Sequence, residues 1–95
     1  MLYLLKNIWE SAVYKIEIIS SARKDMDSLE KKFFIQVKDK ILALASEPRP
    51  HNSIKLTADE GYRVRSGDYR ILYRIDDKKK VVYIYRIKHR KEVYR

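Results

Sequence analysis

The first hydrophobic pattern along the chain is that of a strand. Residues 13–19 read VYKIEII, in which an apolar side chain occupies every second position around two charged residues. Such alternation is typical of a strand with one buried face, because successive side chains of a strand point to opposite sides. We therefore predict a half-buried strand over residues 13–19, with Tyr14, Ile16 and Ile18 toward the core.

The pattern then takes the period of a helix, with a serine in position to cap each of two segments. Ser20 or Ser21 can cap a short helix that ends near Asp27, and Ser28 can cap a longer helix that ends near Ser46. The longer segment carries a stripe of apolar residues on one helical face: Phe34, Val37, Ile41 and Leu44. Two such helices in succession predict a hairpin whose apolar side covers another layer.

After a loop over residues 48–61, the period of the pattern becomes two. The segments 61–65, 69–76 and 80–88 each alternate, and turn-forming residues separate them. Within the loop, residues 54–56 fit a short extended piece. An N-terminal strand, a helical hairpin and an antiparallel three-strand meander, followed by a short C-terminal segment, together predict an α+β fold.

Alternation also predicts which residues face one another across the meander. Pairing Ile75 with Val81 aligns the apolar residues of the last two strands, and it places Arg70 opposite Arg86. The first turn of the meander, by the same reasoning, places Arg65 opposite Arg70. A slip of one residue would mix the two faces, so we expect this register to be strongly specified.

The two faces of the predicted meander differ in chemistry. The apolar face carries the tyrosines, Tyr69, Tyr73, Tyr83 and Tyr85, which we expect to pack in the core and not to stack on nucleic-acid bases. The other face carries a row of Arg65, Arg70 and Arg86, with Arg63 and Arg74 nearby. Like charges opposite one another destabilise a sheet by some tenths of a kcal/mol per pair. The row therefore favours an anionic ligand, and the planar fork of arginine suits phosphate; the alternative is a face that is merely solvated.

The charge balance points in the same direction. The net charge is +9, and residues 62–95 hold twelve Lys or Arg against four Asp or Glu, a net of +8. This concentration favours a polyanionic partner, such as nucleic acid, an anionic membrane or an acidic protein. The sequence has no cysteine, which excludes disulfides and cysteine nucleophiles and suits a reducing cytosol. No apolar run approaches the roughly 20 residues that a membrane span needs.

The last third of the chain resembles the RelE/ParE toxin superfamily of bacterial and archaeal toxin–antitoxin pairs. The segments RVRSGDYRILY, from Arg63, and HRKEVYR, from His89, carry the resemblance. It implies a single RelE-like domain over residues 13–95, with residues 1–12 as an N-terminal extension. RelE-type members are endoribonucleases that cut mRNA in the ribosomal A site, whereas members of the ParE branch inhibit DNA gyrase.

The resemblance also implies roles for individual residues. Arg70 matches the arginine that holds the scissile phosphate, and Arg90 matches a second catalytic basic residue. Tyr94 matches the C-terminal tyrosine that stacks on the substrate or polarises it. Arg63 and Arg65 stand where the family has basic residues on the second strand, and we predict that they bind RNA or phosphate.

Proton transfer is the step that the sequence assigns least clearly. RNA carries its own nucleophile, the 2′-hydroxyl, so cleavage needs alignment, charge stabilisation and proton transfer but no metal or cofactor. Histidine ordinarily titrates near pH 6.5, which favours His89, while the resemblance favours Tyr94. We keep both as catalytic candidates, and the strand pattern adds Arg86 and Lys88 to the phosphate-binding set. The acidic residues of the meander lie in turns, which predicts no metal site.

The sequence leaves three functions open. The first is a toxin that acts as a ribosome-dependent, metal-independent mRNA endoribonuclease and inhibits translation. The second is a DNA gyrase inhibitor on the same fold, and the third is a non-catalytic RNA-binding or inactivated homologue. The resemblance further implies a cytoplasmic protein without a membrane partner, and a RelB-like, acidic antitoxin that folds on binding.

Overall fold

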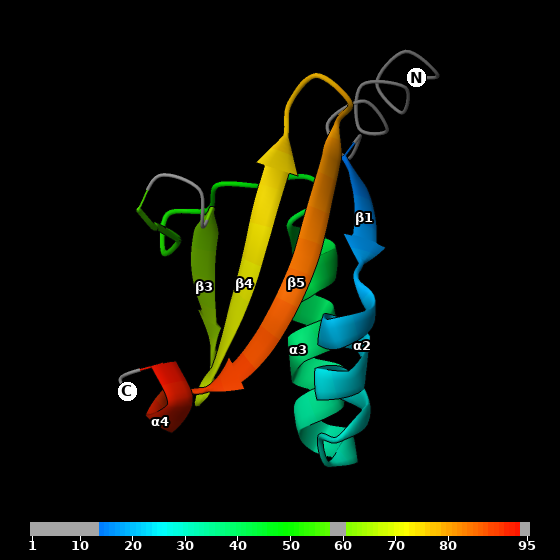
Figure 1. Cartoon of the computed structure of the whole chain (residues 1–95), viewed down its shortest axis with the longest axis vertical. Coiled ribbons are helices and arrows are strands. Elements are labelled where there is room, and N and C mark those ends of the chain that lie inside the picture. Colours follow the sequence, from blue (N-terminus) through cyan, green and yellow to red (C-terminus); the bar gives the residue numbers. More distant parts are fainter. Residues whose placement is uncertain (1–13, 58–60, 94–95) are drawn as a thin grey trace, which may run out of the picture.

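The computed structural model describes residues 14–57 and 61–93, so the predicted extension of residues 1–12 and the candidate residue Tyr94 lie outside the described residues. The elements are β1 (Lys15–Ile18), α2 (Ser20–Asp27), α3 (Lys31–Ala43), β2 (Ile54–Lys55), β3 (Tyr62–Ser66), β4 (Tyr69–Asp76), β5 (Val81–His89) and α4 (Arg90–Val93). This order confirms the predicted α+β fold (Figure 1). β2 is the short extended piece that the loop sequence predicted.

The three long strands form the predicted meander, and two short strands extend the sheet at its edges. The order of strands in the sheet is β1-β5-β4-β3-β2. β1 pairs in parallel with β5, from Lys15 opposite Val81 to Ile18 opposite Ile84, and β2 pairs antiparallel with β3. The strand that comes first in the chain therefore lies beside the last one, a neighbour that alternation within a strand cannot reveal.

The hairpin of β3 and β4 has the predicted register. Val64 lies opposite Ile71, and Arg65 lies opposite Arg70. Gly67 forms the turn with φ of +60°, a left-handed conformation that glycine adopts without steric cost. The two arginines are therefore neighbours on adjacent strands, next to a tight turn.

The hairpin of β4 and β5 corrects the prediction. Ile75 lies opposite Val82, one residue beyond the expected partner. Arg70 lies opposite Lys88 and not opposite Arg86. The predicted row of arginines is thus wrong in its third member, which is a lysine.

A β-bulge at Tyr85 accounts for the difference in register. Leu72 lies opposite Arg86, and the next residue, Tyr73, lies opposite Ile84, so Tyr85 is the extra residue of β5. Two residues of a bulged strand face a single position of its partner, which interrupts the alternation of side chains. The core residues of β5 are consequently two positions apart from Val82 to Ile84 and three positions apart from Ile84 to Ile87.

The bulge decides which side chains of β5 enter the core. They are the aliphatic residues Val82, Ile84 and Ile87, which are at most 5% exposed. Tyr73 on β4 is fully buried, as predicted. For Tyr83 and Tyr85 the prediction was wrong, because Tyr83 lies opposite Arg74, and the guanidinium carbon of Arg74 lies 4.5 Å from the centre of the Tyr85 ring. Both tyrosines therefore lie on the sheet face that points away from the core.

Helix α3 covers one face of the sheet, as Figure 1 shows. Its predicted apolar stripe is confirmed, since Val37, Ile41 and Leu44 are at most 1% exposed. The predicted serine caps are wrong: the N-cap of α2 is Ile19, that of α3 is Glu30, and neither makes a side-chain capping hydrogen bond. Packing of the apolar stripe, more than capping, therefore fixes the position of α3.

Helix α2 lies beside β5 where β1 ends, and its side chains bind the backbone at that edge. β1 pairs with β5 only as far as Ile84. Beyond that point, the Ser21 hydroxyl donates to the Tyr85 carbonyl at 2.8 Å, and the Asp25 carboxylate accepts from the Ile87 N–H at 2.8 Å. Residues four apart share one side of a helix, so α2 closes this edge of the sheet against further strand pairing.

The loop after α3 is tied to the sheet by two side chains. The Tyr73 hydroxyl donates to the Pro48 carbonyl at 2.8 Å, and its burial raises the pKa of Tyr73 to about 12. Arg49 donates to Asp77 at 2.8 Å and to the Tyr62 hydroxyl at 3.0 Å. The hydrogen bond from Arg49 lowers the pKa of Asp77 to about 2. These contacts fix the start of the loop that leads into β2.

Candidate phosphate-binding site

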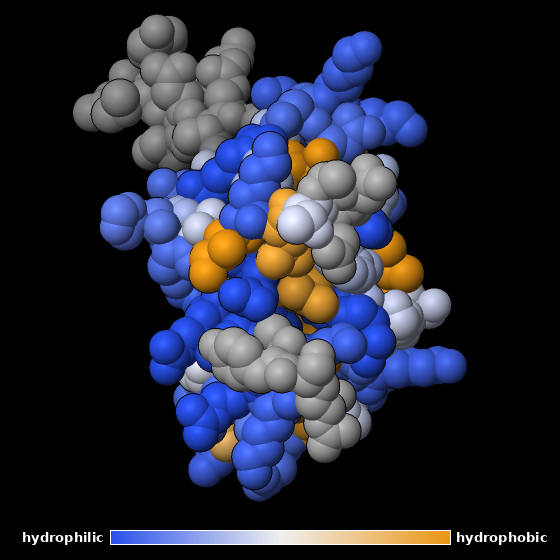
Figure 2. All heavy atoms as spheres, turned by 60° about the vertical axis from the view of Figure 1, so that its left-hand side comes forward, coloured by the Kyte–Doolittle hydropathy of each residue, from blue (hydrophilic) through white to orange (hydrophobic). Residues whose placement is uncertain are grey.

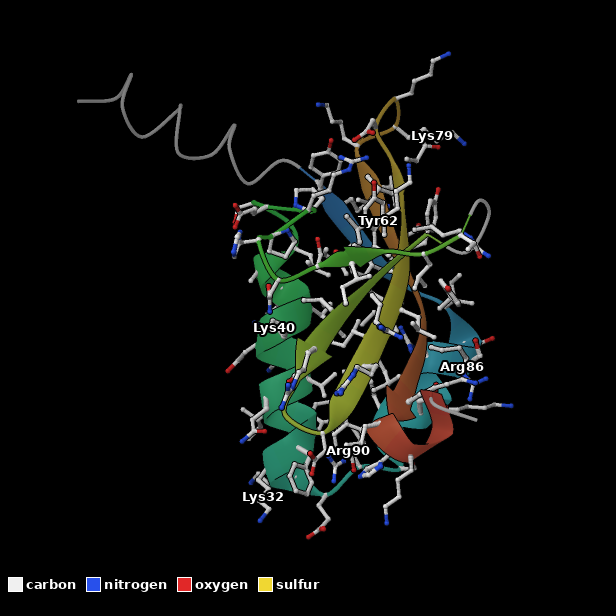
Figure 3. The ribbon with its side chains drawn as sticks, turned by 90° about the vertical axis from the view of Figure 1, so that its left-hand side faces the viewer. Lys32, Lys40, Tyr62, Lys79, Arg86 and Arg90 are labelled. Carbon is white, nitrogen blue, oxygen red and sulfur yellow. The ribbon has the colours of Figure 1, made fainter. Side chains whose placement is uncertain are left out.

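Basic side chains gather on the sheet face that points away from α3, which we call the open face. The strand registers place on it Arg63, Arg65, Arg70, Arg74, Tyr83, Arg86 and Lys88. Figure 3 shows the two sides of the sheet, with Lys32 and Lys40 on α3 at one side and Arg86 at the other. Six of the twelve Lys and Arg residues in the last third of the sequence thus lie on one face of the sheet.

Arg70 lies at the centre of a row of three cations on this face. Its directly opposite neighbours are Arg65 on β3 and Lys88 on β5. Adjacent strands are about 4.8 Å apart, so the three side chains start within about 10 Å of one another. Like charges at opposite positions repel, and a bound anion would relieve that repulsion.

Arg70 is a buried cation, with 8% of its surface exposed. Its Nη1 donates to the carbonyl oxygens of Gly67 and Tyr69, both at 3.4 Å, and Arg65 Nε donates to the same Gly67 carbonyl at 3.1 Å. Among the side chains of residues 14–57 and 61–91, no Asp or Glu oxygen lies within 4.0 Å of the Arg70 guanidinium. A largely desolvated cation held only by carbonyl dipoles favours an anionic ligand.

A groove of about 320 Å³ opens beside Arg70. It is lined by Asn52, Ile54, Arg63, Arg65 and Arg70. The sequence predicted the three arginines but missed Asn52 and Ile54, which reach the groove because Ile54 of β2 lies opposite Arg63 of β3. Figure 2 brings this side of the molecule forward and shows a small apolar patch among hydrophilic residues. The groove therefore combines cations with an amide and an apolar wall.

Arg86 stands apart from the other predicted phosphate-binding residues. Its Nε donates to an Asp25 oxygen at 2.8 Å, and its Nη2 lies 3.5 Å from the other oxygen of that carboxylate. Because its charge is already compensated, Arg86 contributes less attraction for an anion than Arg65 or Lys88. No local pattern could reveal this pair, since Asp25 lies 61 residues earlier in the chain.

Helix α4 begins where the turn between β3 and β4 meets the end of β5. The Arg90 N–H donates to the Asp68 carbonyl at 2.7 Å, and Arg90 Nε lies 3.8 Å from Asp68 Oδ1. Arg90 is thereby fixed at the turn whose Gly67 carbonyl binds Arg65 and Arg70. The structure thus brings Arg70 and Arg90, the two arginines predicted to be catalytic, to one end of the sheet.

His89 lies on the helix side of the sheet, opposite to Arg70. It pairs with Tyr69, and the two rings meet edge to face with their centres 5.3 Å apart. The centre of the Tyr69 ring lies in turn 5.6 Å from that of Phe33 on α3. His89 Nδ1 accepts a hydrogen bond from the Lys91 N–H at 3.3 Å, so Nε2 carries the proton of the neutral ring. A role in proton transfer would require His89 to act around the end of β5.

Two further findings concern the described part of the chain. Within residues 14–57 and 61–93, no three His, Cys, Asp or Glu side chains are grouped so that they could hold a metal ion. The same residues contain no helix with the length and apolar character that crossing a bilayer requires.

Comparison with known proteins identifies the family. A model described as the ParE toxin of the type II toxin–antitoxin system parDE matches residues 16–94. The chain belongs to the RelE/ParE toxin superfamily. It is similar to the toxin RelG of Mycobacterium tuberculosis, with 32% identity over 84 residues that make up 86% of this chain and 97% of RelG. Every described residue of the open face and of the groove, from Asn52 to Lys88, lies within the span that the family model matches.

Solved structures of RelE toxins have the same fold as this RelE/ParE toxin. The archaeal RelE–RelB complex from Pyrococcus horikoshii gives a TM-score of 0.73 at 32% identity, covering 82% of this chain and 96% of that one. The isolated RelE toxin of E. coli gives a TM-score of 0.71 at 28% identity, covering 86% and 92% of the two chains. The predicted RelE-like fold is thereby confirmed.

Proposed function

We propose that this toxin is a ribosome-dependent mRNA endoribonuclease that inhibits translation. The observation that carries the proposal is Arg70, a buried cation beside a groove, which lacks a carboxylate partner among the described residues. A phosphodiester offers such a cation two oxygens in the geometry that the guanidinium fork matches. The similarity to solved RelE toxins supports RelE-type cleavage over the other activities of the superfamily.

The proposed reaction uses the 2′-hydroxyl of the RNA as its nucleophile. The 2′-oxygen attacks the adjacent phosphorus, and the bond to the 5′-oxygen of the next nucleotide breaks, which leaves a cyclic phosphate and a 5′-hydroxyl. Arg70 stabilises the negative charge that develops on the phosphoryl oxygens, and one preorganised donor of this kind contributes roughly 3–4 kcal/mol to the transition state. Arg90, held at the Asp68 turn, supplies a second donor.

Two proton transfers complete the reaction, one from the 2′-hydroxyl and one to the leaving 5′-oxygen. Tyr94 follows α4 in the chain, and a cation placed beside a tyrosine lowers the pKa of its hydroxyl and makes it a better proton carrier. His89 carries an imidazole, which can accept or donate a proton, but it lies on the helix side of the sheet. The pH profile of cleavage by His89→Ala and Tyr94→Phe separates them, because the residue that carries the proton changes the profile as well as the rate.

The test is to induce the toxin alone and to map mRNA ends with and without a block of translation initiation. We expect new ends that depend on translation, and we expect Arg70→Ala to lower cleavage by about 100- to 1000-fold. Arg23→Ala is the matched control, because Arg23 is an exposed arginine on α2. Growth inhibition without translation-dependent ends, or full cleavage by Arg70→Ala, would contradict the proposal.

A second candidate function is inhibition of DNA gyrase, which the ParE description of the matching family model favours. Purified toxin is added to a gyrase supercoiling assay, and induced cells are examined for DNA damage. Blocked supercoiling with intact mRNA would favour this function. Harmless expression combined with salt-sensitive RNA binding would favour a non-catalytic or inactivated homologue.

We further infer a cognate antitoxin with a RelB-like, acidic segment that folds on the toxin. Support comes from the P. horikoshii relative, which was solved as a RelE–RelB complex, and from the net charge of +9 on this chain. An acidic segment would compensate the cations of the open face. Toxin, antitoxin and translating ribosome would then meet in the cytoplasm. Co-expression of the cognate antitoxin, sought as a short acidic reading frame beside the toxin gene, should restore growth.

A further inference from the structure

Two tyrosines of the open face have no place in the core or in the proposed reaction. Tyr83 lies opposite Arg74, and the Arg74 guanidinium carbon lies 4.5 Å from the centre of the Tyr85 ring. Both tyrosines are partly exposed, and Arg74 is exposed. The bulge at Tyr85 creates this group, because it sends aliphatic residues of β5 to the core and leaves both rings on the open face.

We propose that Arg74, Tyr83 and Tyr85 form a stacking platform that binds the bases of single-stranded RNA beside the phosphate site. The inference rests on the proposed endoribonuclease function and deepens it, since it assigns the position of the strand next to the scissile phosphate. Aromatic rings on an exposed sheet stack on unpaired bases, and an arginine over an aromatic ring offers a further planar surface. Because every base has a π face, such a platform tolerates different sequences.

The platform lies on the same face as the phosphate site and within reach of one RNA strand. Arg74 is four residues along β4 from Arg70, which corresponds to about 13 Å at the usual rise of a strand. Leu72 lies between them on the same face and provides an apolar floor, and Tyr83 lies on the neighbouring strand about 4.8 Å away. A strand with one phosphate at Arg70 can therefore place adjoining bases over the platform.

Most charges around the platform are positive, which favours RNA over a neutral peptide as its ligand. Two acidic residues lie near it and have partners of their own: Glu17, opposite Tyr83, lies 3.8 Å from Lys15 Nζ, and Asp76 accepts from the Lys79 N–H at 2.9 Å. Arg63 lies opposite Leu72 on β3, and Lys78, Lys79 and Lys80 are exposed in the turn that follows β4. An extended cationic surface with aromatic rings inside it is the arrangement by which proteins follow a single strand, with phosphates on cations and bases on rings. An antitoxin segment is the competing occupant, and the experiment below distinguishes the two.

The experiment measures binding of a fluorescein-labelled, 2′-O-methyl single-stranded RNA by anisotropy over a series of salt concentrations. Methylation removes the nucleophile, so the full chain is measured without cleavage. We expect Tyr83→Ala and Tyr85→Ala each to raise the Kd by about 5- to 150-fold, the effect of losing one stacked base. Tyr83→Phe and Tyr85→Phe keep the ring and should bind nearly as well as the wild type, whereas Tyr83→Leu keeps apolar bulk and should not.

An oligonucleotide without bases provides the sharpest control. Wild type and Tyr83→Ala should bind an abasic strand of the same length equally, because only phosphate contacts remain. Arg65→Ala, which removes a cation of the phosphate site, should reduce the slope of log K against log salt by about 0.7, the value for one phosphate contact on a single strand. The tyrosine variants should leave this slope unchanged, and circular dichroism checks that each variant is folded.

Several outcomes would overturn the platform. These are failure of the wild type to bind the oligonucleotide, equal affinity of Tyr83→Ala and wild type for it, or equal losses on abasic and normal strands. Variants that keep RNA affinity but lose affinity for the co-expressed antitoxin would show that the platform binds protein instead. The proposed function can fail independently of the platform. If the toxin binds RNA through the tyrosines but never cuts it, the nuclease function alone is refuted. If the wild type cuts mRNA and the tyrosine variants cut and bind RNA equally well, the platform alone is refuted.

Discussion

Replacing Asp25 by alanine tests whether one carboxylate holds the edge of β5. In the native structure, Asp25 accepts hydrogen bonds from Arg86 Nε and from the Ile87 N–H, both at 2.8 Å. The substitution removes both acceptors at once, at a point on β5 beyond the end of β1. We therefore expect a protein that still folds but has a lower free energy of unfolding.

The size of the effect depends mainly on the Ile87 amide. Ile87 is 5% exposed, and a buried donor that loses its acceptor costs about 1–3 kcal/mol. The ion pair adds less, at most about 1 kcal/mol, because the Arg86 and Asp25 side chains are 38% and 21% exposed. A total of about 1–4 kcal/mol corresponds to a decrease in Tm of roughly 5–30 °C for a domain of this size.

Urea unfolding followed by far-UV circular dichroism measures the loss directly. Asp27→Ala is the matched control, because Asp27 lies exposed on the same helix, and such a surface substitution should change stability by less than about 0.5 kcal/mol. Asp25→Asn keeps an oxygen for the Ile87 amide and should lose only about 1 kcal/mol. The reasoning is refuted if Asp25→Ala is as stable as Asp27→Ala, or if Asp25→Asn is as unstable as Asp25→Ala.

Other substitutions test the contacts that hold the loop after α3 against the sheet, and the pH dependence of the stability that these contacts provide. Tyr73→Phe loses the donor to the Pro48 carbonyl and should lower the free energy of unfolding by about 1–3 kcal/mol in urea. Because burial raises the pKa of Tyr73 from 10.0 to about 12, the wild type should lose stability as pH rises through that interval, and Tyr73→Phe should lack this component in alkaline melts. The hydrogen bond from Arg49 lowers the pKa of Asp77 from 3.8 to about 2, so its stabilisation is complete above pH 3.8 and lost toward pH 2; Asp77→Asn should flatten acid melts over this range. Gly61→Ala should cost more than about 1 kcal/mol in the same urea assay, because φ is +86° and the added methyl would overlap the Tyr73 carbonyl.

The parts of the fold that the sequence predicted correctly are those in which one short segment contains the whole signal. The stripe through Val37 and Ile41 depends only on the helical period, and both residues are buried. The pairing of Arg65 with Arg70 follows from a short turn, because a tight turn fixes the register of its hairpin. The parallel pairing of β1 with β5 depends on residues more than sixty positions apart, which no local pattern records.

The candidate site was predictable to the extent that it lies in one hairpin. Arg63, Arg65 and Arg70 come from β3 and β4, and the structure places all three along the groove. Asn52 joins them through the pairing of β2, and Arg86 is withdrawn from them by Asp25 of a distant helix. Both effects are tertiary contacts, so alternation and charge could not reveal them.

The error in β5 has a physical origin in the segment itself. From Val81 to Tyr85 every side chain is apolar or aromatic, so alternation does not indicate which residues face the core. Packing makes the choice, because aliphatic Val82 and Ile84 fill a dry interior completely. The hydroxyl groups of Tyr83 and Tyr85, by contrast, require a hydrogen-bond partner or water, which the open face provides.

The bulge at Tyr85 is what makes one strand serve both the core and the open face. If strict alternation continued from Val82 and Ile84, Arg86 and Lys88 would point into the core, where unpaired charges are strongly unfavourable. If the alternation were instead set by a buried Ile87, Tyr83 and Tyr85 would enter the core, and Val82 and Ile84 would be exposed among the arginines. One extra residue avoids both outcomes, since it keeps Ile87 buried while Lys88 stays opposite Arg70. The same local irregularity therefore completes the hydrophobic core, builds the cationic row and places two aromatic rings beside it.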